Sequence, residues 1–360
     1  MSMNKATASK PKILLAASGG VDSTVAAYLL REAGWDVHCA VFIMSAQHFA
    51  VADAAMKAAQ ELKMPLEMVD LRERFAELVI KPFCEDYANG RTPSPCVMCN
   101  PLVKFKALCD TADRLGIEKV ATGHYARLQQ LDKGWAISIA DALQRDQRYM
   151  LYRLTQQQLS RLVLPLAELT KQQIRDIAKQ QQLSCFDAPD SEENCFIKDA
   201  DYVRFLEENG YSGKQGRFLL PDGRAIPHLG THRYTIGQRK GLGIGGTAPL
   251  FVQSIKENGD IRLCYAGGEY AERVMLENVV QNPNFSFDAG SVYSAKIRSA
   301  AKPAECMVES YENGILTLLF PQPVRAAAPG QSAVLYKDGF VAGGGVIQSA
   351  VAAAQENVIR

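Results

Sequence analysis

The chain lacks any apolar run of 18 residues, the length that a membrane-spanning helix needs, so it predicts no transmembrane segment. Its N-terminus, from Met1 to Pro11, is polar with scattered lysines and lacks the apolar core of a signal peptide. We therefore expect a cytoplasmic protein. No internal repeat or low-complexity segment stands out, and a length of 360 residues favours two or three domains.

An excess of charge of one sign is also lacking, because the formal net charge is only +1, so overall charge does not indicate a nucleic-acid partner. The local distribution is more informative. Between Ser212 and Gly241, one acid, Asp222, stands against six cations: Lys214, Arg217, Arg224, Arg233, Arg239 and Lys240. This basic segment, with interleaved aromatic and histidine residues, suits a phosphate backbone, and a solvated loop surface is the alternative interpretation.

A disulfide framework is not expected, since the nine cysteines are odd in number and irregularly spaced in a long chain without a signal peptide. Cys96 and Cys99 form a C-x-x-C pair, a spacing that suits two ligands of one metal or a redox pair. Cys195 lies among polar residues and is a third candidate, with a buried structural role as its alternative. The remaining six are interpreted as structural: Cys39, Cys84, Cys109, Cys185, Cys264 and Cys306.

Strands and helices alternate over the first 125 residues, which predicts an α/β fold with a parallel sheet and helices on both faces. The expected strands are Lys12–Ala17, Asp36–Ile43, Pro65–Asp70 and Glu118–Thr122, and the expected helices are Val21–Ala33, Val51–Leu62 and Lys104–Leu115. Ligands then bind at the carboxyl ends of the strands. Further helices are expected at Tyr149–Leu162 and Thr170–Gln182, and short strands from Phe251 onward predict a small β-barrel.

A glycine-rich turn, Ser-Gly-Gly-Val-Asp-Ser at 18–23, separates the first strand from the first helix. Glycines let the backbone approach an anion, and the free N–H groups of a helix start point at it. Ser18 and Ser23 add hydroxyl donors, while Asp22 is placed to hold a metal ion on the phosphates. The motif is neither a Walker A loop nor a dinucleotide fingerprint. A plain strand-to-helix turn is the alternative.

This loop resembles the PP-loop of ATP pyrophosphatases, which split ATP into AMP and pyrophosphate. Five further motifs follow in order, at 90–100, 121–127, 146–152, 190–197 and 232–246, and the tail Pro329–Tyr336 completes the set. Together they resemble the tRNA-specific 2-thiouridylase family over nearly the whole chain. The resemblance implies a PP-loop domain at 1–200, a central tRNA-contacting domain at 201–270 and a C-terminal β-barrel at 271–360.

Members of that family adenylate the C2 carbonyl oxygen of the wobble uridine in tRNA, and sulfur then displaces AMP. Adenylation is needed because a carbonyl oxygen is a poor leaving group, and sulfur is a strong nucleophile at neutral pH. The resemblance therefore implies ATP, Mg²⁺, a tRNA substrate and a sulfur donor system, which is a cysteine desulfurase or a relay protein. A monomer is expected.

The resemblance also implies roles for individual residues. The nucleotide loop is Ala16, Ala17, Ser18, Gly19, Gly20, Val21, Asp22 and Ser23, with Ile43 and Gly123 flanking adenine and ribose. Cys99 is the expected nucleophile and Cys195 the expected persulfide carrier. Ser94, Pro95 and Cys96 are expected to meet the target base. The other expected tRNA contacts are His124, Arg145, Asp146, Gln147, Arg298, Ser299 and Gln331.

Cys96 departs from the family, whose best-known members carry aspartate there. Three thiolates can hold a 4Fe–4S cluster and leave one iron open for an extra sulfide. We therefore favour the hypothesis of a cluster on Cys96, Cys99 and Cys195. The rival hypothesis is a persulfide relay, in which Cys195 carries the sulfur and Cys99 resolves it, and the resemblance includes a disulfide bond among the expected features.

Two other functions are considered. Other PP-loop enzymes amidate carboxylates or make argininosuccinate, and they need neither the Pro-x-Pro-Cys-x-x-Cys segment nor a basic central region. A non-catalytic tRNA-binding or iron–sulfur protein with a vestigial loop is a different class, and the intact motif at 18–23 argues against it.

Overall fold

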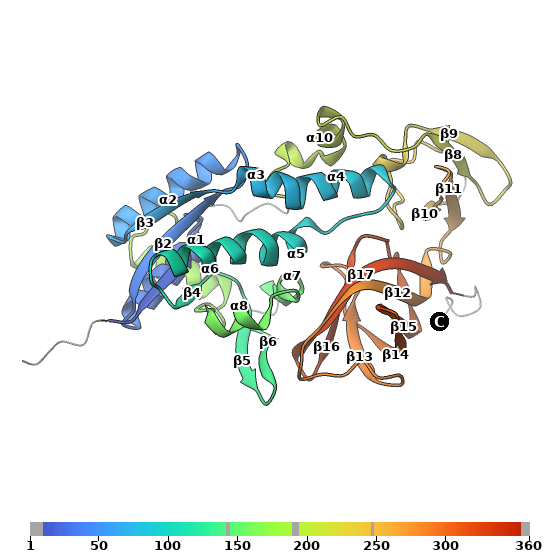
Figure 1. Cartoon of the computed structure of the whole chain (residues 1–360). Helices are drawn as coiled ribbons and strands as arrows, with labels where there is room; N and C mark the ends of the chain where they lie inside the picture. Colours follow the sequence, from blue (N-terminus) through green and yellow to red (C-terminus); the bar gives the residue numbers. More distant parts are fainter. Residues whose placement is uncertain (1–9, 142–144, 189–193, 246–247, 354–360) are drawn as a thin grey trace, which may run out of the picture.

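The protein is represented by a computed structural model that describes residues 10–141, 145–188, 194–245 and 248–353. Three parts are visible in Figure 1: an α/β body, a small central sheet and a C-terminal barrel. Among the described residues, no helix has both the length and the apolar character that crossing a membrane would take. The α/β body and the barrel confirm the predicted fold class, while the exact division of the chain near residues 200 and 270 stays a prediction.

The α/β body contains a five-stranded parallel sheet with the order β3-β2-β1-β4-β7. Its strands are β1 (Lys12–Ala16), β2 (Asp36–Ile43), β3 (Leu66–Asp70), β4 (Lys119–Ala121) and β7 (Leu162–Val163). Ile13 and Leu15 are buried against one face and Leu14 against the other. This alternation follows from the two-residue period of a strand and explains why both faces need helices.

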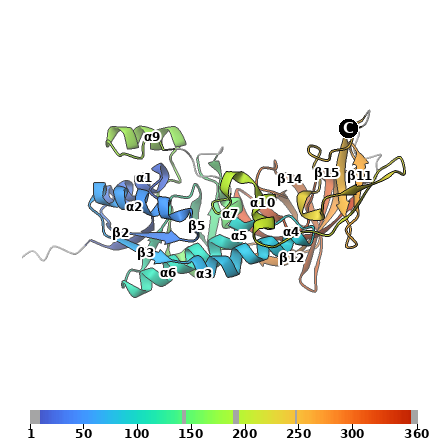
Figure 2. The same cartoon turned by 90° about the horizontal axis from the view of Figure 1, so that it is seen from above.

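Helices cover both faces of this sheet, as Figure 2 shows. One face packs against α1 (Val21–Glu32) and α9 (Lys171–Gln180), whose buried residues share one apolar cluster with β1. The other face packs against α6 (Phe105–Arg114). The remaining helix predicted in this body is α2 (His48–Leu62), which begins three residues earlier than expected.

Two helical segments were not predicted. The first runs through α3 (Arg72–Phe75), a π-helical turn η1 (Ala76–Ile80) and α4 (Lys81–Ala88). Pro82 lies within this run directly after the π-helical turn, an irregularity of the helix at the point where the proline has no N–H to donate. The second runs through α5 (Pro95–Cys99) and the π-helical turn η2 (Asn100–Lys104) into α6, so the helix expected from Lys104 begins at Pro95 instead.

The helix predicted at Tyr149–Leu162 is wrong as a single element. The structure has α7 (Arg148–Leu151), α8 (Gln156–Arg161) and then β7. Thr155 and Gln158 form a capping box that starts a new helix, which explains the break. A further helix, α10 (Tyr202–Glu208), follows the Cys195 region.

The central sheet has the order β10-β11-β8-β9. It consists of β8 (Gly216–Leu219), β9 (Ala225–His228), β10 (Leu250–Ile255) and β11 (Ile261–Tyr265). The strands predicted at Phe251 and Asp260 therefore belong to this sheet and not to the barrel. Phe218, Val252, Ile261 and Leu263 give it a separate apolar core, which explains the assignment.

The C-terminal barrel is antiparallel and closes through the pairing of β12 with β17. Its strands are β12 (Tyr270–Gln281), β13 (Val292–Lys296), β14 (Ala304–Glu312), β15 (Ile315–Arg325), β16 (Ser332–Lys337) and β17 (Phe340–Ala352). The two closing strands were not predicted, and Gly343, Gly344 and Gly345 obscured β17. A side chain at any of the three would crowd a neighbouring strand. The hairpin β5 (Arg127–Leu131) and β6 (Gly134–Ser138) joins the barrel through Ser138 and Phe340.

The loop between α4 and α5 contacts both other parts of the molecule. A Cβ on Gly90 would lie 2.7 Å from Cγ2 of Ile255 in the central sheet. Arg91 pairs with Glu277 of β12 at 2.7 Å. Thr92 donates its N–H to the Pro329 carbonyl at 2.7 Å, and the Gln331 amide donates to the Thr92 carbonyl at 3.1 Å. The approach to Cys96 is therefore held by all three parts.

We predict that Gly330→Ala destabilises the protein more than Gly339→Ala. Both glycines have positive φ, +93° and +83°, so each alanine incurs a backbone cost of about 1–3 kcal/mol. Only at Gly330 would the new Cβ also press on the Thr92 backbone, at 3.0 Å, whereas Gly339 has open space. Thermal and urea unfolding of the two variants measure the difference, and equal losses would contradict tight docking of this turn.

Candidate active site

The nucleotide loop at 16–23 joins β1 to α1. Gly19 has φ +71°, and a side chain there would collide with Ala54 of α2, so this position requires glycine. The hydroxyls of Ser18 and Ser23 lie 3.1 Å apart, and Ser23 donates to the Gly20 carbonyl at 3.1 Å. The loop is thus internally ordered at the start of α1, as an anion site requires.

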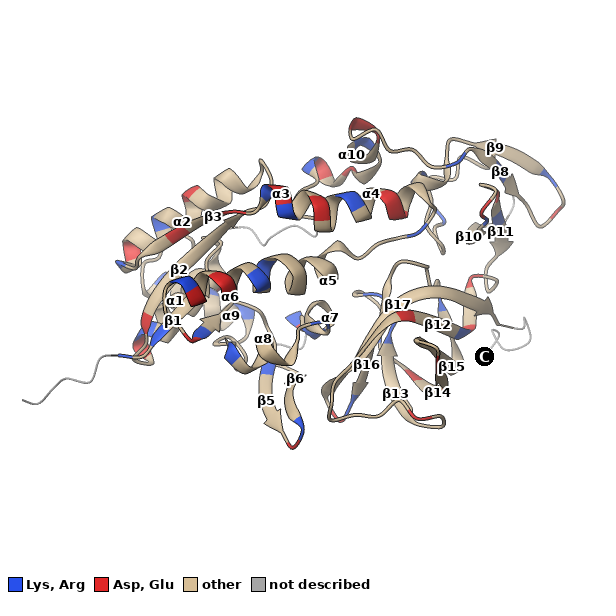
Figure 3. Cartoon of the chain, viewed as in Figure 1, with Lys and Arg blue, Asp and Glu red and all other residues tan. Residues whose placement is uncertain are grey.

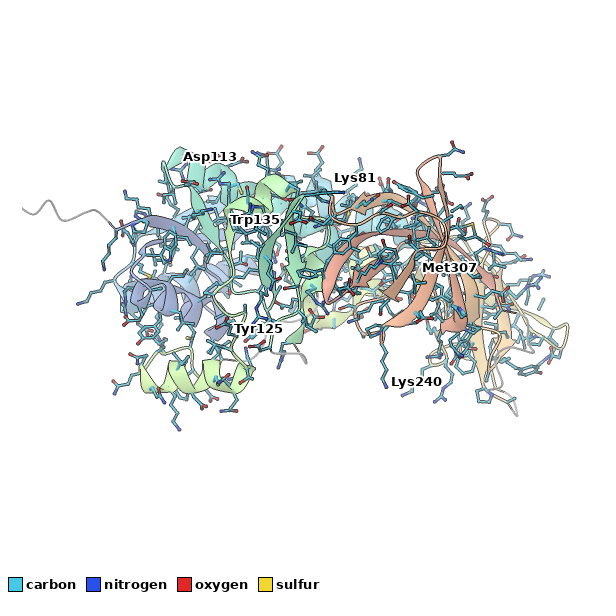
Figure 4. All side chains as sticks on the ribbon, turned by 90° about the horizontal axis from the view of Figure 1, so that it is seen from below. Lys81, Asp113, Tyr125, Trp135, Lys240 and Met307 are labelled. Atoms are coloured by element: carbon cyan, nitrogen blue, oxygen red, sulfur yellow. The ribbon has the colours of Figure 1, made fainter. Side chains whose placement is uncertain are left out.

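Asp22 is held by two residues from other segments of the chain. Lys171, the first residue of α9, places its Nζ atom 2.7 and 2.8 Å from the two carboxylate oxygens. The Tyr125 hydroxyl donates to Oδ1 at 2.5 Å. Figure 4 shows Tyr125 within the α/β body, beside the pale green helix α9. Neither residue was predicted from the sequence as a partner of Asp22.

The segment after β4 lies against the nucleotide loop, as predicted for carboxyl ends of neighbouring strands. A Cβ on Gly123 would lie 3.2 Å from the Asp22 carbonyl carbon and from the Ser23 nitrogen. Ile43 is at the end of β2, but its side chain is buried with Val41 and Ala52. Its carbonyl accepts the Leu71 N–H at 2.8 Å. A contact of Ile43 with adenine stays a prediction.

The cysteine segment begins where the loop held by the barrel ends. Ser94 precedes α5, and Pro95 occupies its first turn, so Cys96 and Cys99 lie on this short helix. Cys99 is buried, whereas Cys96 and Cys195 are partly exposed. Phe196 anchors Cys195, because its ring packs 5.2 to 5.5 Å from those of three other phenylalanines: Phe75, Phe83 and Phe205.

Lys104 is the cation of this region, and the sequence analysis missed it. Burial raises the pKa of the Cys99 thiol to about 12. The positive charge of Lys104 acts against this increase, and the neighbouring thiols of Cys195 and Cys96 add to it. Burial by itself would lower the pKa of the Lys104 ammonium group. The thiolate forms of Cys99, Cys195 and Cys96 together have the larger, opposite effect, so the pKa is raised. Lys104 follows Cys99 by five residues, and the π-helical turn η2 between them brings residues at that spacing onto one face of the helical run.

The charge of Lys104 also affects the pKa values of two histidines. Burial and this lysine lower the pKa of His124 to about 3 and that of His48 to about 4, so both are neutral at physiological pH. His124 contacts the Thr122 hydroxyl at 2.9 Å and immediately precedes Tyr125, the partner of Asp22. The segment 122–125 therefore connects the nucleotide loop with the cysteine segment, and the two form one candidate active site.

Several residues expected to contact tRNA make contacts within the chain. Asp146 pairs with Arg148 at 2.9 Å, and Gln147 accepts the Tyr125 N–H at 2.9 Å. Arg298 donates to the Ala326 carbonyl at 2.6 Å, and Gln331 holds the loop before Cys96. Arg145 and Ser299 are exposed. Gln147 and Gln331 thus contact segments of the candidate active site, and binding of tRNA by any member of the set stays a prediction.

The basic segment at 212–241 is partly neutralised. Arg224 pairs with Asp222 at 2.8 Å, and Arg233 pairs with Glu207 of α10. Arg239 and Lys240 line a hollow of 590 Å³ between the central sheet and the barrel. In Figure 3, acidic and basic positions are mixed on the helices of the α/β body in this view. Arg217, Arg239 and Lys240 are exposed, and their contact with a phosphate backbone stays a prediction.

The placement of the cysteines does not support a metal cluster. Among the described residues, which include all nine cysteines, no three His, Cys, Asp or Glu side chains gather as one metal site. None of the nine cysteines is in a disulfide bond. The cluster on Cys96, Cys99 and Cys195 and the disulfide bond both stay predictions.

Comparisons with known proteins cover almost the whole chain. Family models match at residues 11–199 (tRNA methyl transferase HUP domain), 204–261 (tRNA methyl transferase PRC-barrel domain) and 278–347 (aminomethyltransferase beta-barrel domain). A tRNA-specific 2-thiouridylase of Pelobacter propionicus is 41% identical, over 94% of this chain and 98% of its own. One of Leptospira biflexa is 38% identical, over 94% of each chain.

Solved structures are less similar. A 4-thiouridine synthetase in complex with RNA and ATP is 18% identical, with a TM-score of 0.36 over 55% of this chain and 50% of that one. This likeness is too low to support a conclusion about the present chain.

We predict that Cys99 resists alkylation in the folded, tRNA-free protein. With a pKa of about 12, about one Cys99 in ten thousand is a thiolate at pH 8, against about one in four for an ordinary cysteine. Peptide mass spectrometry after iodoacetamide treatment between pH 7 and 9 measures the labelling. Protein unfolded in guanidinium is the control, in which all nine cysteines react. Labelling of Cys99 as fast as that of Cys195 in the folded protein would contradict the burial.

Proposed function

The chain belongs to the family of the tRNA-specific 2-thiouridylases, and we propose that it uses ATP to replace the C2 oxygen of the wobble uridine in tRNA with sulfur. One observation supports this above all: the segment 122–125 lies between the nucleotide loop and the cysteine segment. Tyr125 donates a hydrogen bond to Asp22, and His124 lies near Lys104. A base at the cysteine segment is then beside the site that activates it.

In the first half-reaction, the C2 oxygen attacks the α-phosphorus of ATP, and pyrophosphate leaves. The loop binds the phosphates through its backbone N–H groups and serine hydroxyls. The Asp22 carboxylate offers hard oxygen ligands, which fit Mg²⁺ and would hold it. Bound there, the ion neutralises phosphate charge. The neutral His124 presents no positive charge to the tRNA base.

In the second half-reaction, we propose the persulfide relay. The terminal sulfur of a persulfide on Cys195 attacks C2, and the C2–O bond breaks as AMP leaves. Cys99 loses its proton to solvent and attacks the Cys195 sulfur, breaking the S–S bond. The thiouridine sulfur is released, and a Cys99–Cys195 disulfide forms, which a cellular thiol reductant reopens. The proximity of these two cysteines and of Lys104 supports this sequence.

The remaining assignments follow from this proposal. A cysteine desulfurase or a relay protein supplies the sulfur of the persulfide. A protein that modifies tRNA works where tRNA is used, which supports a cytoplasmic location. One nucleotide loop and one cysteine set per chain are enough for the reaction, which supports a monomer.

Asp22→Asn is expected to reduce 2-thiouridine formation at least about 100-fold, because it removes a charge that positions Mg²⁺ and the phosphates. Nucleoside mass spectrometry of tRNA incubated with protein, ATP, Mg²⁺ and a sulfur source measures the product. The matched control is Asp132→Asn in the exposed β5–β6 turn, which should leave the rate unchanged. Undiminished thiolation by Asp22→Asn would contradict the proposed role of the loop.

Iron analysis distinguishes the relay from the cluster. After oxygen-free purification, the relay predicts far less than one iron per chain in wild type, and a Cys96→Ser variant that still thiolates tRNA. About four irons and matching acid-labile sulfide in wild type, both lost in Cys96→Ser, would overturn the relay and establish the cluster.

A further inference from the structure

The Lys171–Asp22 ion pair is placed unusually for a structural contact. Its members come from the first turns of α9 and α1, so the N-termini of these two helices meet there. The Lys171 side chain is only 14% exposed and that of Asp22 33%. A lysine so covered needs a counter-ion, and Asp22 supplies it.

Attachment of α9 to the sheet does not depend on this pair. Ile174 and Ala178 are fully buried in the apolar cluster that α1 and β1 share. Thr170 and Gln173 cap the helix reciprocally. Apolar burial therefore already attaches α9 to the body, and the capping box already starts the helix. The ion pair is required for neither.

The position of Lys171 is also unfavourable for the helix itself. A cation in the first turn opposes the helix macrodipole, whose N-terminal end is positive. The first turn of α9 contains no acidic residue. Two positive helix ends and one ammonium group therefore meet at the Asp22 carboxylate of the phosphate loop. Positive potential from both helix ends at this loop suits an anionic ligand.

We propose that Lys171 binds the phosphate chain of ATP and stabilises the departing pyrophosphate, with Asp22 holding its ammonium group until the nucleotide arrives. This inference rests on the proposed function and extends its nucleotide site by one residue from outside the loop. An ammonium group fixed where charge develops on a leaving group lowers the barrier to its departure.

Tyr125 fits the same exchange. Its hydroxyl bond to Oδ1 of Asp22 is independent of Lys171, so it keeps the carboxylate oriented when the ammonium turns to the phosphates. No proton moves in this exchange, because Asp22 remains an anion and Lys171 a cation. The chain thus holds both groups close to their working positions before the nucleotide binds.

Calorimetric titration of the full chain with Mg²⁺ and either α,β-methylene-ATP or AMP tests the proposal. Lys171→Met should weaken binding of the ATP analogue about 10- to 100-fold, as expected for a lost charge-assisted contact, and leave AMP binding within about twofold. Lys171→Arg should retain most of the affinity for the analogue. Lys179→Met, on the exposed side of the same helix, is the matched control and should change neither ligand.

An equal loss for AMP and the analogue, or no loss for either, would overturn the proposal. If Lys171→Met does not fold, Asp22→Asn with Lys171→Gln provides a neutral pair. Compared with Asp22→Asn alone, this double variant should bind the analogue at least about 10-fold more weakly and AMP equally. The titrations need no tRNA, so they test the role of Lys171 separately from the proposed function. The proposed function would be rejected by a different result, the failure of the wild type to thiolate tRNA.

Discussion

The candidate active site depends on one constraint: the barrel holds the loop that precedes Cys96. Two backbone groups of Thr92 are bound by the turn at 329–331, and Arg91 is bound by Glu277. The cysteine helix starts three residues after Thr92, so these contacts restrict its position. The barrel thereby holds the cysteine segment from outside the α/β body, whereas the nucleotide loop is ordered by contacts within that body.

Buried charge organises the interior between the two sites. Lys104 lies near three thiols and two histidines, and together with burial it keeps both imidazoles neutral. Burial meanwhile holds Cys99 as a thiol. A resting thiol of this kind is protected from oxidation and stray alkylation, since the thiolate is the reactive form. The chain thus keeps a buried thiol beside a cation that is partly exposed.

The sequence allowed the parallel sheet, the nucleotide loop and the cysteine set to be predicted, because each has a local pattern. Strand β2 was predicted to the residue, since it ends in the apolar run Cys39–Ile43 and follows the helix-ending Gly34. The closing strands of the barrel were missed, because the glycines of β17 are explained only by neighbouring strands. Lys171 and Tyr125 were missed as site residues because their partner, Asp22, lies on another element. Lys104 was missed because residues five apart share a face only in a π-helical turn, which the sequence did not predict.

The central claim is that nucleotide and thiol chemistry act on one base in one active site. Its most direct test is a trapping measurement on a variant with both Cys99 and Cys195 changed to serine. Incubated with tRNA, Mg²⁺ and ATP labelled at the α-phosphorus, this protein should accumulate labelled AMP on tRNA, up to about one equivalent per site, and form no 2-thiouridine. Absence of label on tRNA, with wild type active beside it, would contradict the claim.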